Sequence, residues 1–293
     1  MGFQINTNVS ALSAYRNLSN TQNSLTSSLE KLSSGLRINK AADDAAGLSI
    51  SEGLRAQIGG LTVASRNAQD GISVVQTAEG ALGEVHSNLQ RLRDLAVQAG
   101  NDSNNADSRL AIKSEADALV KEIGRIGSST NFNGISLLDG ENASLSFQVG
   151  AGSSASNQIA VGLANADLGA LVAYTEGATE AIAAGSDADA SIGAMAWESA
   201  TDATANLDSI DAAIKYVSTA RSELGASQNR FETAINSINI SKENLSASES
   251  RIRDTDMAAE MANFTRSNIL QQAGTSMLAQ ANSLPQGVLS LLG

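Results

Sequence analysis

The sequence predicts a mostly α-helical protein in which long helices from the two ends of the chain pair in a coiled-coil rod, with a small β-hairpin region between them. The 293 residues contain a single proline and many alanines and glutamines, which favours long helices. Apolar residues recur at helical spacing over most of the chain. Aromatic residues make up only 3% of the chain, which suits narrow seams between helices better than a thick interior. We therefore expect an elongated, hairpin-shaped molecule.

The strongest periodic pattern lies toward the C-terminal end, where every seventh residue is apolar. A heptad repeat sustained over this length predicts supercoiled packing of long helices. Leu207, Ile214 and Ile235 are expected to fill the second apolar position of the seam. The rod-seam residues themselves are Ile210, Val217, Leu224, Phe231, Ile238, Leu245 and Ile252.

Helical spacing also predicts a helix within residues 4–36, a long helix over about 46–99 and a shorter helix that ends near Ile126. At 1.5 Å per residue the long helix would extend roughly 80 Å. The last helix contains Pro285. Proline lacks a backbone donor and crowds the carbonyl four residues earlier, so we expect a kink or the end of the helix near Leu284.

The pattern changes in the middle of the chain. Segments 145–151 and 157–163 have the character of two short strands, which places a β-hairpin within residues 131–163. Residues 164–204 are rich in Ala, Gly and Asp and have little periodicity, so the sequence predicts no definite structure there.

Charge divides the chain into two ends and a centre. Residues 1–15 and 267–293 contain no Asp, Glu, Lys or Arg, whereas residues 141–210 contain nine acidic residues and no basic one. An uncharged helix is more easily buried, because no ion has to be desolvated. We therefore expect buried terminal helices within 1–45 and 254–293, and an exposed rod domain formed by residues 46–253 with an acidic outer segment.

A single uncharged helix that exposes an apolar stripe is not stable in water. The terminal helices are therefore expected to become fully ordered on polymerisation, where other copies of the chain cover the stripe. An intramolecular four-helix bundle is the alternative. The residues expected to take part in assembly are Ile5, Val9, Leu12, Leu25, Leu32, Leu270, Met277, Leu284, Val288 and Leu291.

The composition excludes several functional classes. The chain has no cysteine, which removes thiol catalysis and thiolate metal sites, and its one histidine, His86, has no ligand or base partner in sequence. We predict no catalytic residue, no metal site and no cofactor. A net charge of −12 argues against nucleic-acid binding. No apolar run is long enough to span a membrane, and the N-terminus lacks the pattern of a cleaved secretory signal peptide.

Long motifs at both ends of the chain resemble bacterial flagellin. The N-terminal motifs are INTNVSALSAYRNL and LEKLSSGLRINKAADDAAGLSI, followed by the segment 64–99 and NFNG. The C-terminal motifs are LGASQNRFETAINSI, ENLSASESRIRDTDMAAE and ILQQAGTSMLAQANSLPQGVLSLLG. The resemblance covers about residues 1–163 and 205–293, and its motifs are far longer than a chance match.

The resemblance implies a subunit that polymerises into the flagellar filament and so provides motility, with the paired termini forming the inner tube. It implies an extracellular location, reached by type III export without a cleaved signal peptide. The implied partners are identical subunits, the filament cap, hook–filament junction proteins and an export chaperone on the C-terminal helix. A hook–filament junction protein is the alternative function; the NFNG region and the full ILQQAGTSMLAQAN motif favour flagellin. A soluble enzyme is a third hypothesis, and it lacks a plausible set of catalytic residues.

The resemblance also implies recognition by the vertebrate flagellin-recognising toll-like receptor. The matching positions for the receptor and subunit interface are Arg91, Leu95 and Glu115. Arg91 and Leu95 are four residues apart, so we expect one helix face to present both. Without the resemblance, Arg91 would be interpreted as one solvated charge among many.

Overall fold

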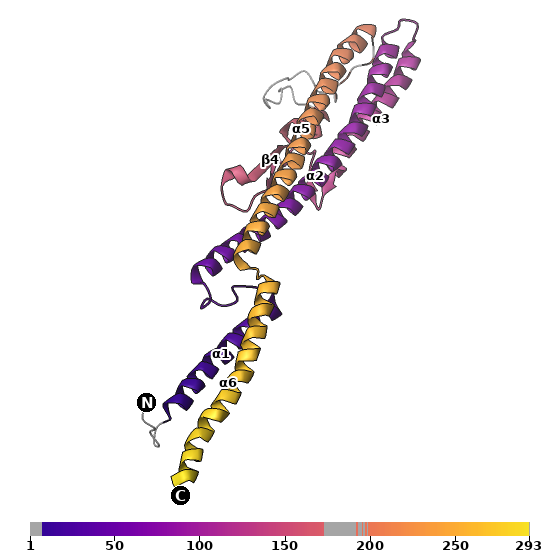
Figure 1. Cartoon of the computed structure of the whole chain (residues 1–293). Coiled ribbons are helices and arrows are strands. Elements are labelled where there is room, and N and C mark those ends of the chain that lie inside the picture. The colour runs from indigo at the N-terminus through magenta and orange to yellow at the C-terminus, as the bar shows by residue number, and fades with distance from the viewer. Residues whose placement is uncertain (1–7, 173–191, 193–194, 196, 198, 293) are drawn as a thin grey trace. The chain divides into compact units, whose positions relative to one another are not determined.

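The computed structural model describes residues 8–172, 192, 195, 197 and 199–292 (Figure 1). The fold is mostly α-helical, as the sequence predicts. The helices are α1 (Val9–Ser34), α2 (Ala45–Ala99), α3 (Ala106–Ser129), the short α4 (Leu168–Val172), α5 (Ala200–Arg253) and α6 (Met257–Leu292). The chain forms two compact units, one of residues 1–58 and 242–293 and one of residues 59–241. We describe each unit in turn.

In the first unit, α1 and α6 run side by side in opposite directions. Partway along the pair, the Leu18 side chain lies against Gly274. Toward one end, the backbone N–H of Thr255 donates to the carbonyl of Gly35 at 3.1 Å. Gly35 ends α1 with a φ of 73°, a left-handed conformation that glycine adopts without steric cost.

The connectors that follow α1 and α5 hold each other. Leu36 and Asp254 form an isolated antiparallel bridge, and the backbone N–H of Arg37 donates to the carbonyl of Arg253 at 2.6 Å. The Arg253 side chain is only 10% exposed, and its guanidinium contacts Glu52 at 2.7 Å. In the connector after α1, Ile38 is 1% exposed. The two connectors are therefore joined by backbone hydrogen bonds and lie beside the ion pair of Arg253 with Glu52.

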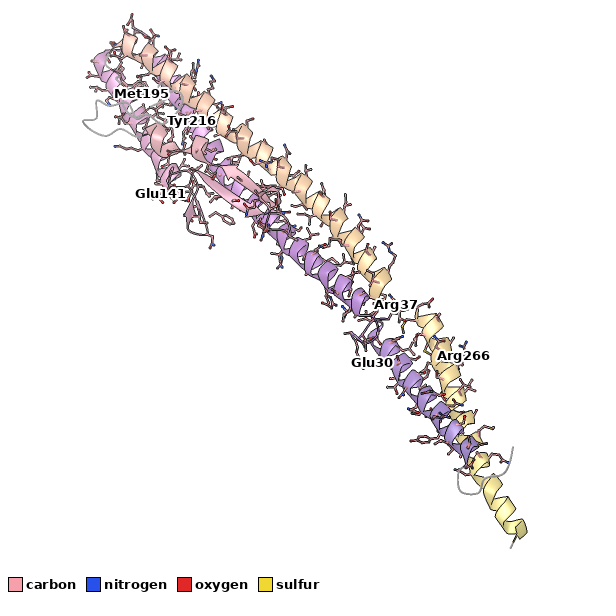
Figure 2. All side chains as sticks on the ribbon, turned by 90° about the vertical axis from the view of Figure 1, so that its left-hand side faces the viewer. Glu30, Arg37, Glu141, Met195, Tyr216 and Arg266 are labelled. Carbon is pink, nitrogen blue, oxygen red and sulfur yellow. The ribbon has the colours of Figure 1, made fainter. Side chains whose placement is uncertain are left out.

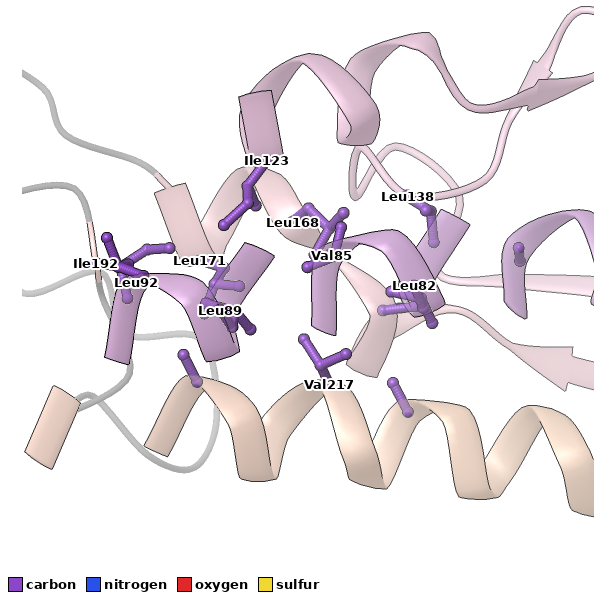
Figure 3. Packing of buried hydrophobic residues seen from close by; sticks show 14 of the residues in the cluster. Leu82, Val85, Leu89, Leu92, Ile123, Leu138, Leu168, Leu171, Ile192 and Val217 are labelled. Atoms are coloured by element: carbon purple, nitrogen blue, oxygen red, sulfur yellow. The ribbon is translucent and has the colours of Figure 1, made fainter. Parts of the chain in front are cut away.

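In the second unit, α2 and α5 lie antiparallel. Two ion pairs link them, Glu79 with Arg221 at 3.2 Å and Arg93 with Asp211 at 2.6 Å. The core lies between these helices, α3, α4 and the strands. In Figure 3, side chains of α2 such as Val85 lie between Val217 of α5 and the side chains of α3 and α4.

The heptad of α5 is buried as expected through most of the rod. The five positions from Ile210 to Ile238 are no more than 5% exposed. Leu245 and Ile252, which belong to the first unit, are half-buried. The long helix predicted over about 46–99 also contributes one face to this core. Its core residues include Ala68, Val75, Leu82, Val85, Leu89 and Leu92.

The expectation for the second seam position is wrong. Three positions after Ile210, Val217 and Leu224 the buried residues are small: Ala213, Ala220 and Ser227. Leu207, Ile214 and Ile235 are only half-buried and pack at the edge of the core. Both offsets, three and four residues, keep a side chain near the same helix face. A prediction based on large apolar residues therefore identified residues at the edge of the seam, while the small residues Ala213 and Ala220 occupy its centre.

The predicted β-hairpin is confirmed. Strands β3 (Ser144–Gln148) and β4 (Gln158–Gly162) pair antiparallel. A second hairpin, β1 (Asn131–Phe132) with β2 (Ile135–Ser136), was not predicted as strands. Its turn residues Asn133 and Gly134 have φ values of 50° and 80°, the conformation that an Asn-Gly pair favours in a two-residue hairpin.

The hairpin β3–β4 packs onto the two long helices of the second unit. Phe147 of β3 meets Phe231 of α5 edge to face, with ring centroids 5.5 Å apart. Asn67 of α2 donates from its side-chain amide to the carbonyl of Gln148 at 3.0 Å. Within the segment 164–204, the described residues Ile192 and Trp197 are buried; most of this segment lies outside the described residues.

Of the two outcomes expected near Leu284, a kink or the end of the last helix, the end of the helix is wrong. α6 continues as α-helix through Pro285 to Leu292. Proline removes one backbone hydrogen bond, and the helix retains those of the neighbouring residues. The carbonyl released by Pro285, that of Ala281, instead accepts a hydrogen bond from the side chain of Asn8 at 2.8 Å.

Candidate functional site

The terminal helices present a large apolar surface to their surroundings. Nine of the fifteen exposed large hydrophobic residues in the described chain lie on α1, α6 or at their ends, and each is 47–64% exposed. In α1 the only buried residue is Ser28, so no large apolar side chain of this helix is fully covered by α6. The nine residues are Val9, Leu12, Tyr15, Leu29, Met257, Met261, Ile269, Leu270 and Met277.

The face of α6 with the lowest exposure is poor in large apolar residues. It follows a spacing of four and three residues through Phe264, Ser267, Gln271, Gly274 and Leu278. Gln271 donates to the side-chain oxygen of Gln22 across the pair. At Gly274, an added Cβ would lie 3.2 Å from Leu18 Cδ1, so the small residue allows close approach of α1. The pair is thus joined by small and polar contacts, which leaves the larger apolar residues elsewhere.

Most of the predicted assembly residues that the structure describes remain outside the pair. Val9, Leu12, Leu270 and Met277 are more than half exposed. Leu25 and Leu32 are half-buried in the pair. Ile5 lies outside the described residues, as do the side chains of Leu284, Val288 and Leu291.

A second apolar face of α6 was missed in the sequence. Met261, Ala262, Thr265, Arg266, Ile269 and Leu270 line an open groove along the helix. Arg266, seen on α6 in Figure 2, is the last charged residue before the uncharged segment. These lining residues form pairs four positions apart in the sequence, such as Met261 with Thr265 and Arg266 with Leu270. That spacing would have identified this face of the helix from the sequence.

The three residues expected at the receptor and subunit interface lie at different depths. Arg91 of α2 and Glu115 of α3 form an exposed ion pair, with Arg91 Nε and Nη2 at 2.9 and 2.6 Å from Glu115 Oε1. Leu95 is 1% exposed and belongs to the core. The expectation that one helix face presents both Arg91 and Leu95 is therefore wrong for this structure, because Leu95 turns toward α2's buried side.

Tyr216 and His86 each make a polar contact in the second unit, although the buried Nδ1 of His86 has no hydrogen-bond partner among the described residues. Tyr216 of α5 donates its hydroxyl to the carbonyl of Ala164 at 3.3 Å, and burial, followed by the charge of Asp167, raises the pKa of Tyr216. His86 Nε2 lies 3.0 Å from the Gln90 side-chain nitrogen. Among the described residues, no group of three or more His, Cys, Asp or Glu could hold a metal ion. Within the same residues, no helix is long and apolar enough to cross a membrane.

The two uncharged, paired ends match a known family at both termini. The bacterial flagellin N-terminal helical region matches residues 5–143, and the bacterial flagellin C-terminal helical region matches residues 207–292. The chain belongs to the bacterial flagellin family. Flagellin is the structural subunit of the flagellar filament and polymerises with itself, so the chain is a structural protein and not an enzyme.

Relatives support the family over the full length of the chain. The chain is 50% identical to the flagellin of Halalkalibacterium halodurans over 98% of this chain and 99% of that protein. It is 47% identical to the flagellin of Bacillus subtilis over 99% of each chain. The crystal structure of Bacillus cereus flagellin aligns with 59% of this chain and 88% of that chain at 28% identity and a TM-score of 0.47.

Proposed function

We propose that this flagellin polymerises through the exposed apolar faces of α1 and α6, and that residues 1–45 and 254–293 form the inner tube of the filament. Residues 46–253 form the rod around it, with the hairpins of 131–163 and the acidic segment 164–204 facing outward. One observation carries the proposal. Residues 267–292 of α6 include no charged residue, and the apolar residues Leu270 and Met277 in this segment are more than half exposed. Other subunits would remove this surface from water.

The test is seeded polymerisation of purified protein, followed by electron microscopy. Met277→Lys places a charge on the exposed face and should prevent filament growth. Burying an unpaired ammonium group costs several kcal/mol, which exceeds the roughly 1.5–3 kcal/mol gained by burying the methionine side chain that it replaces. Leu110→Lys is the matched control, since Leu110 is an equally exposed apolar residue, at 62%, on α3. Normal filaments from Met277→Lys would overturn the proposal.

Removal of residues 267–293 gives a second arm of the test. The truncated protein should retain the fold of the second unit, reported by the fluorescence of the buried Trp197, and should not polymerise. A hook–filament junction protein is the alternative function. Full-length protein that stays monomeric with seeds and precipitating salt would favour that alternative.

We further propose that the Arg91–Glu115 pair marks a surface for the vertebrate flagellin-recognising toll-like receptor and for neighbouring subunits. The supporting observation is that the pair joins α2 and α3 while its side chains remain 53% and 47% exposed. An arginine held over a packed core suits an interface hot spot. In this proposal Leu95 does not contact the receptor; it packs α2 against the core and so holds the helix that carries Arg91.

Receptor signalling by soluble monomer, free of other microbial ligands, tests this surface. Arg91→Ala should reduce signalling strongly. Arg93→Ala is the control, because Arg93 is a neighbouring exposed arginine whose ion pair is with α5 instead. Equal loss in both variants, or no signalling by the unmodified monomer, would contradict the proposal.

The remaining partners follow from the same surfaces. The groove from Met261 to Leu270 offers an export chaperone an apolar face on the C-terminal helix. The filament cap and hook–filament junction proteins would contact the terminal helices at the filament ends. We place the assembled protein outside the cell, after type III export without a cleaved signal peptide. Intact mass measurement of subunits from filaments tests the last point, since a missing N-terminal segment would contradict it.

A further inference from the structure

The backbone of α6 contains one carbonyl without its usual helical donor. In a regular α-helix, the N–H of residue 285 would donate to the carbonyl of residue 281. Pro285 has no N–H, yet α6 continues on both sides of it. A partly buried carbonyl that loses its donor is costly unless another group replaces it.

A side chain from the opposite end of the chain supplies that donor. Asn8 Nδ2 donates to the Ala281 carbonyl at 2.8 Å across 273 residues of sequence. The other end of the same amide also has a partner, because Asn8 Oδ1 accepts from the backbone N–H of Ala11 at 3.0 Å. Asn8 is therefore the N-cap of α1 and the replacement donor for α6 at once.

This contact ties one side chain to one backbone atom, which distinguishes it from two other contacts in the α1–α6 pair. Leu18 against Gly274 is apolar and non-directional, and the hydrogen bond from Gln271 to Gln22 joins two long side chains. Sliding α6 by one residue would move the Ala281 carbonyl by about 1.5 Å and rotate it by about 100°, beyond reach of the amide. The neighbouring carbonyl of Gln280 already accepts a side-chain hydrogen bond from Ser283 at 2.9 Å, whereas the Ala281 carbonyl has no donor from residue 285.

We propose that Asn8 and Pro285 act together to set the register of α1 against α6, and that Asn8 is a positioning residue for filament assembly. Pro285 makes one carbonyl of α6 receptive, and Asn8 finds it only in the correct register. Because the same amide caps α1, the start of α1 is ordered together with the last turns of α6. The inference rests on the proposed role of the terminal helices in polymerisation.

The test compares substitutions at Asn8 in two backgrounds. Asn8→Ser keeps a good N-cap but cannot reach the Ala281 carbonyl, and it introduces no charge. Pro285→Ala restores the N–H to α6 and so removes the need for the outside donor. The measured quantity is the critical concentration for seeded polymerisation of the full-length chain.

Asn8→Ser should raise the critical concentration about two- to tenfold in the natural background, the range for one net hydrogen bond. In the Pro285→Ala background the same change should have less than about a twofold effect. No effect of Asn8→Ser in the natural background would overturn the inference. An equal effect in both backgrounds would also overturn it, because Asn8 would then act independently of Pro285.

If Pro285→Ala itself prevents filament growth, a comparison of Asn8→Ala with Asn8→Ser tests whether the contact with Ala281 is needed. Should Asn8 serve only as a cap, Asn8→Ala would impair polymerisation and Asn8→Ser would not, which would overturn the inference. If the contact with Ala281 matters, both variants are impaired. Failure of the unmodified chain to polymerise would instead refute the proposed assembly function.

Discussion

Gly71 of α2 lies directly under the ring of Phe231 in the second unit. A Cβ added at Gly71 would lie 2.7, 2.9 and 3.1 Å from three ring atoms of Phe231. The ring is fully buried and is held edge-on by Phe147, so it has little room to move. Overpacking of this kind costs about 1–3 kcal/mol. Replacing a helical glycine by alanine gains about 0.5–1 kcal/mol, so Gly71→Ala should lower the free energy of unfolding by about 1 kcal/mol.

Gly80→Ala provides the control, because Gly80 lies in the same helix and no atom would come within 4 Å of its added Cβ. That variant should be more stable than the natural chain by about 0.5–1 kcal/mol. The assay is urea unfolding of the monomer, followed by the fluorescence of Trp197, the only tryptophan. Both variants gain the same helix propensity, so their difference isolates the packing cost. A Gly71→Ala protein as stable as Gly80→Ala would refute the reasoning.

Three further predictions concern the second unit. Ile238→Asp puts a carboxylate at a position that is 5% exposed, and we expect a loss of about 3–5 kcal/mol, checked as a lower melting temperature by circular dichroism; unchanged melting would contradict it. In urea unfolding, Leu95→Ala should lower the free energy of unfolding by about 2–5 kcal/mol, whereas Glu115→Gln in the exposed ion pair should lower it by less than about 1 kcal/mol. Equal losses would contradict the burial of Leu95 and the exposure of Glu115. Because the pKa of Tyr216 is raised in the folded state, the unfolded chain releases this proton first as the pH rises. Stability from Tyr216 is then complete below the ordinary value of 10.0 and lost above it. Tyr216→Phe should show a shallower alkaline loss of urea stability, and an unchanged slope would count against the assignment.

Much of the fold follows from periodicity in the sequence. The five heptad residues from Ile210 to Ile238 are buried because a seven-residue repeat keeps them on one face of α5. The hairpin of β3 and β4 follows from two short apolar segments close in sequence. The second seam position could not be predicted in the same way, because Ala213 and Ala220 carry too little apolar area to outweigh their larger neighbours in a hydrophobic pattern.

The assembly surface was only partly predictable. The lack of charge at the two ends is visible in composition, and it directed attention to α1 and α6, where the proposed assembly surface lies. Sequence periodicity cannot tell which of two apolar faces contacts the partner helix, so the outward direction of Leu270 and Met277 needed the structure. The burial of Leu95 also depends on the rotation of α2 in the core. The bond between Asn8 and Ala281 joins distant segments, and no local pattern reports it.

The absence of charged side chains from the C-terminal segment affects how the contacts it makes in a filament would respond to temperature, salt and pH. Residues 267–292 contribute no charged side chain that could titrate or be screened by salt. The strength of their contacts depends instead on the release of water from apolar groups, which weakens on cooling and strengthens with sulfate or phosphate. Cold should therefore weaken the contacts made by this segment more than a change of acidity would.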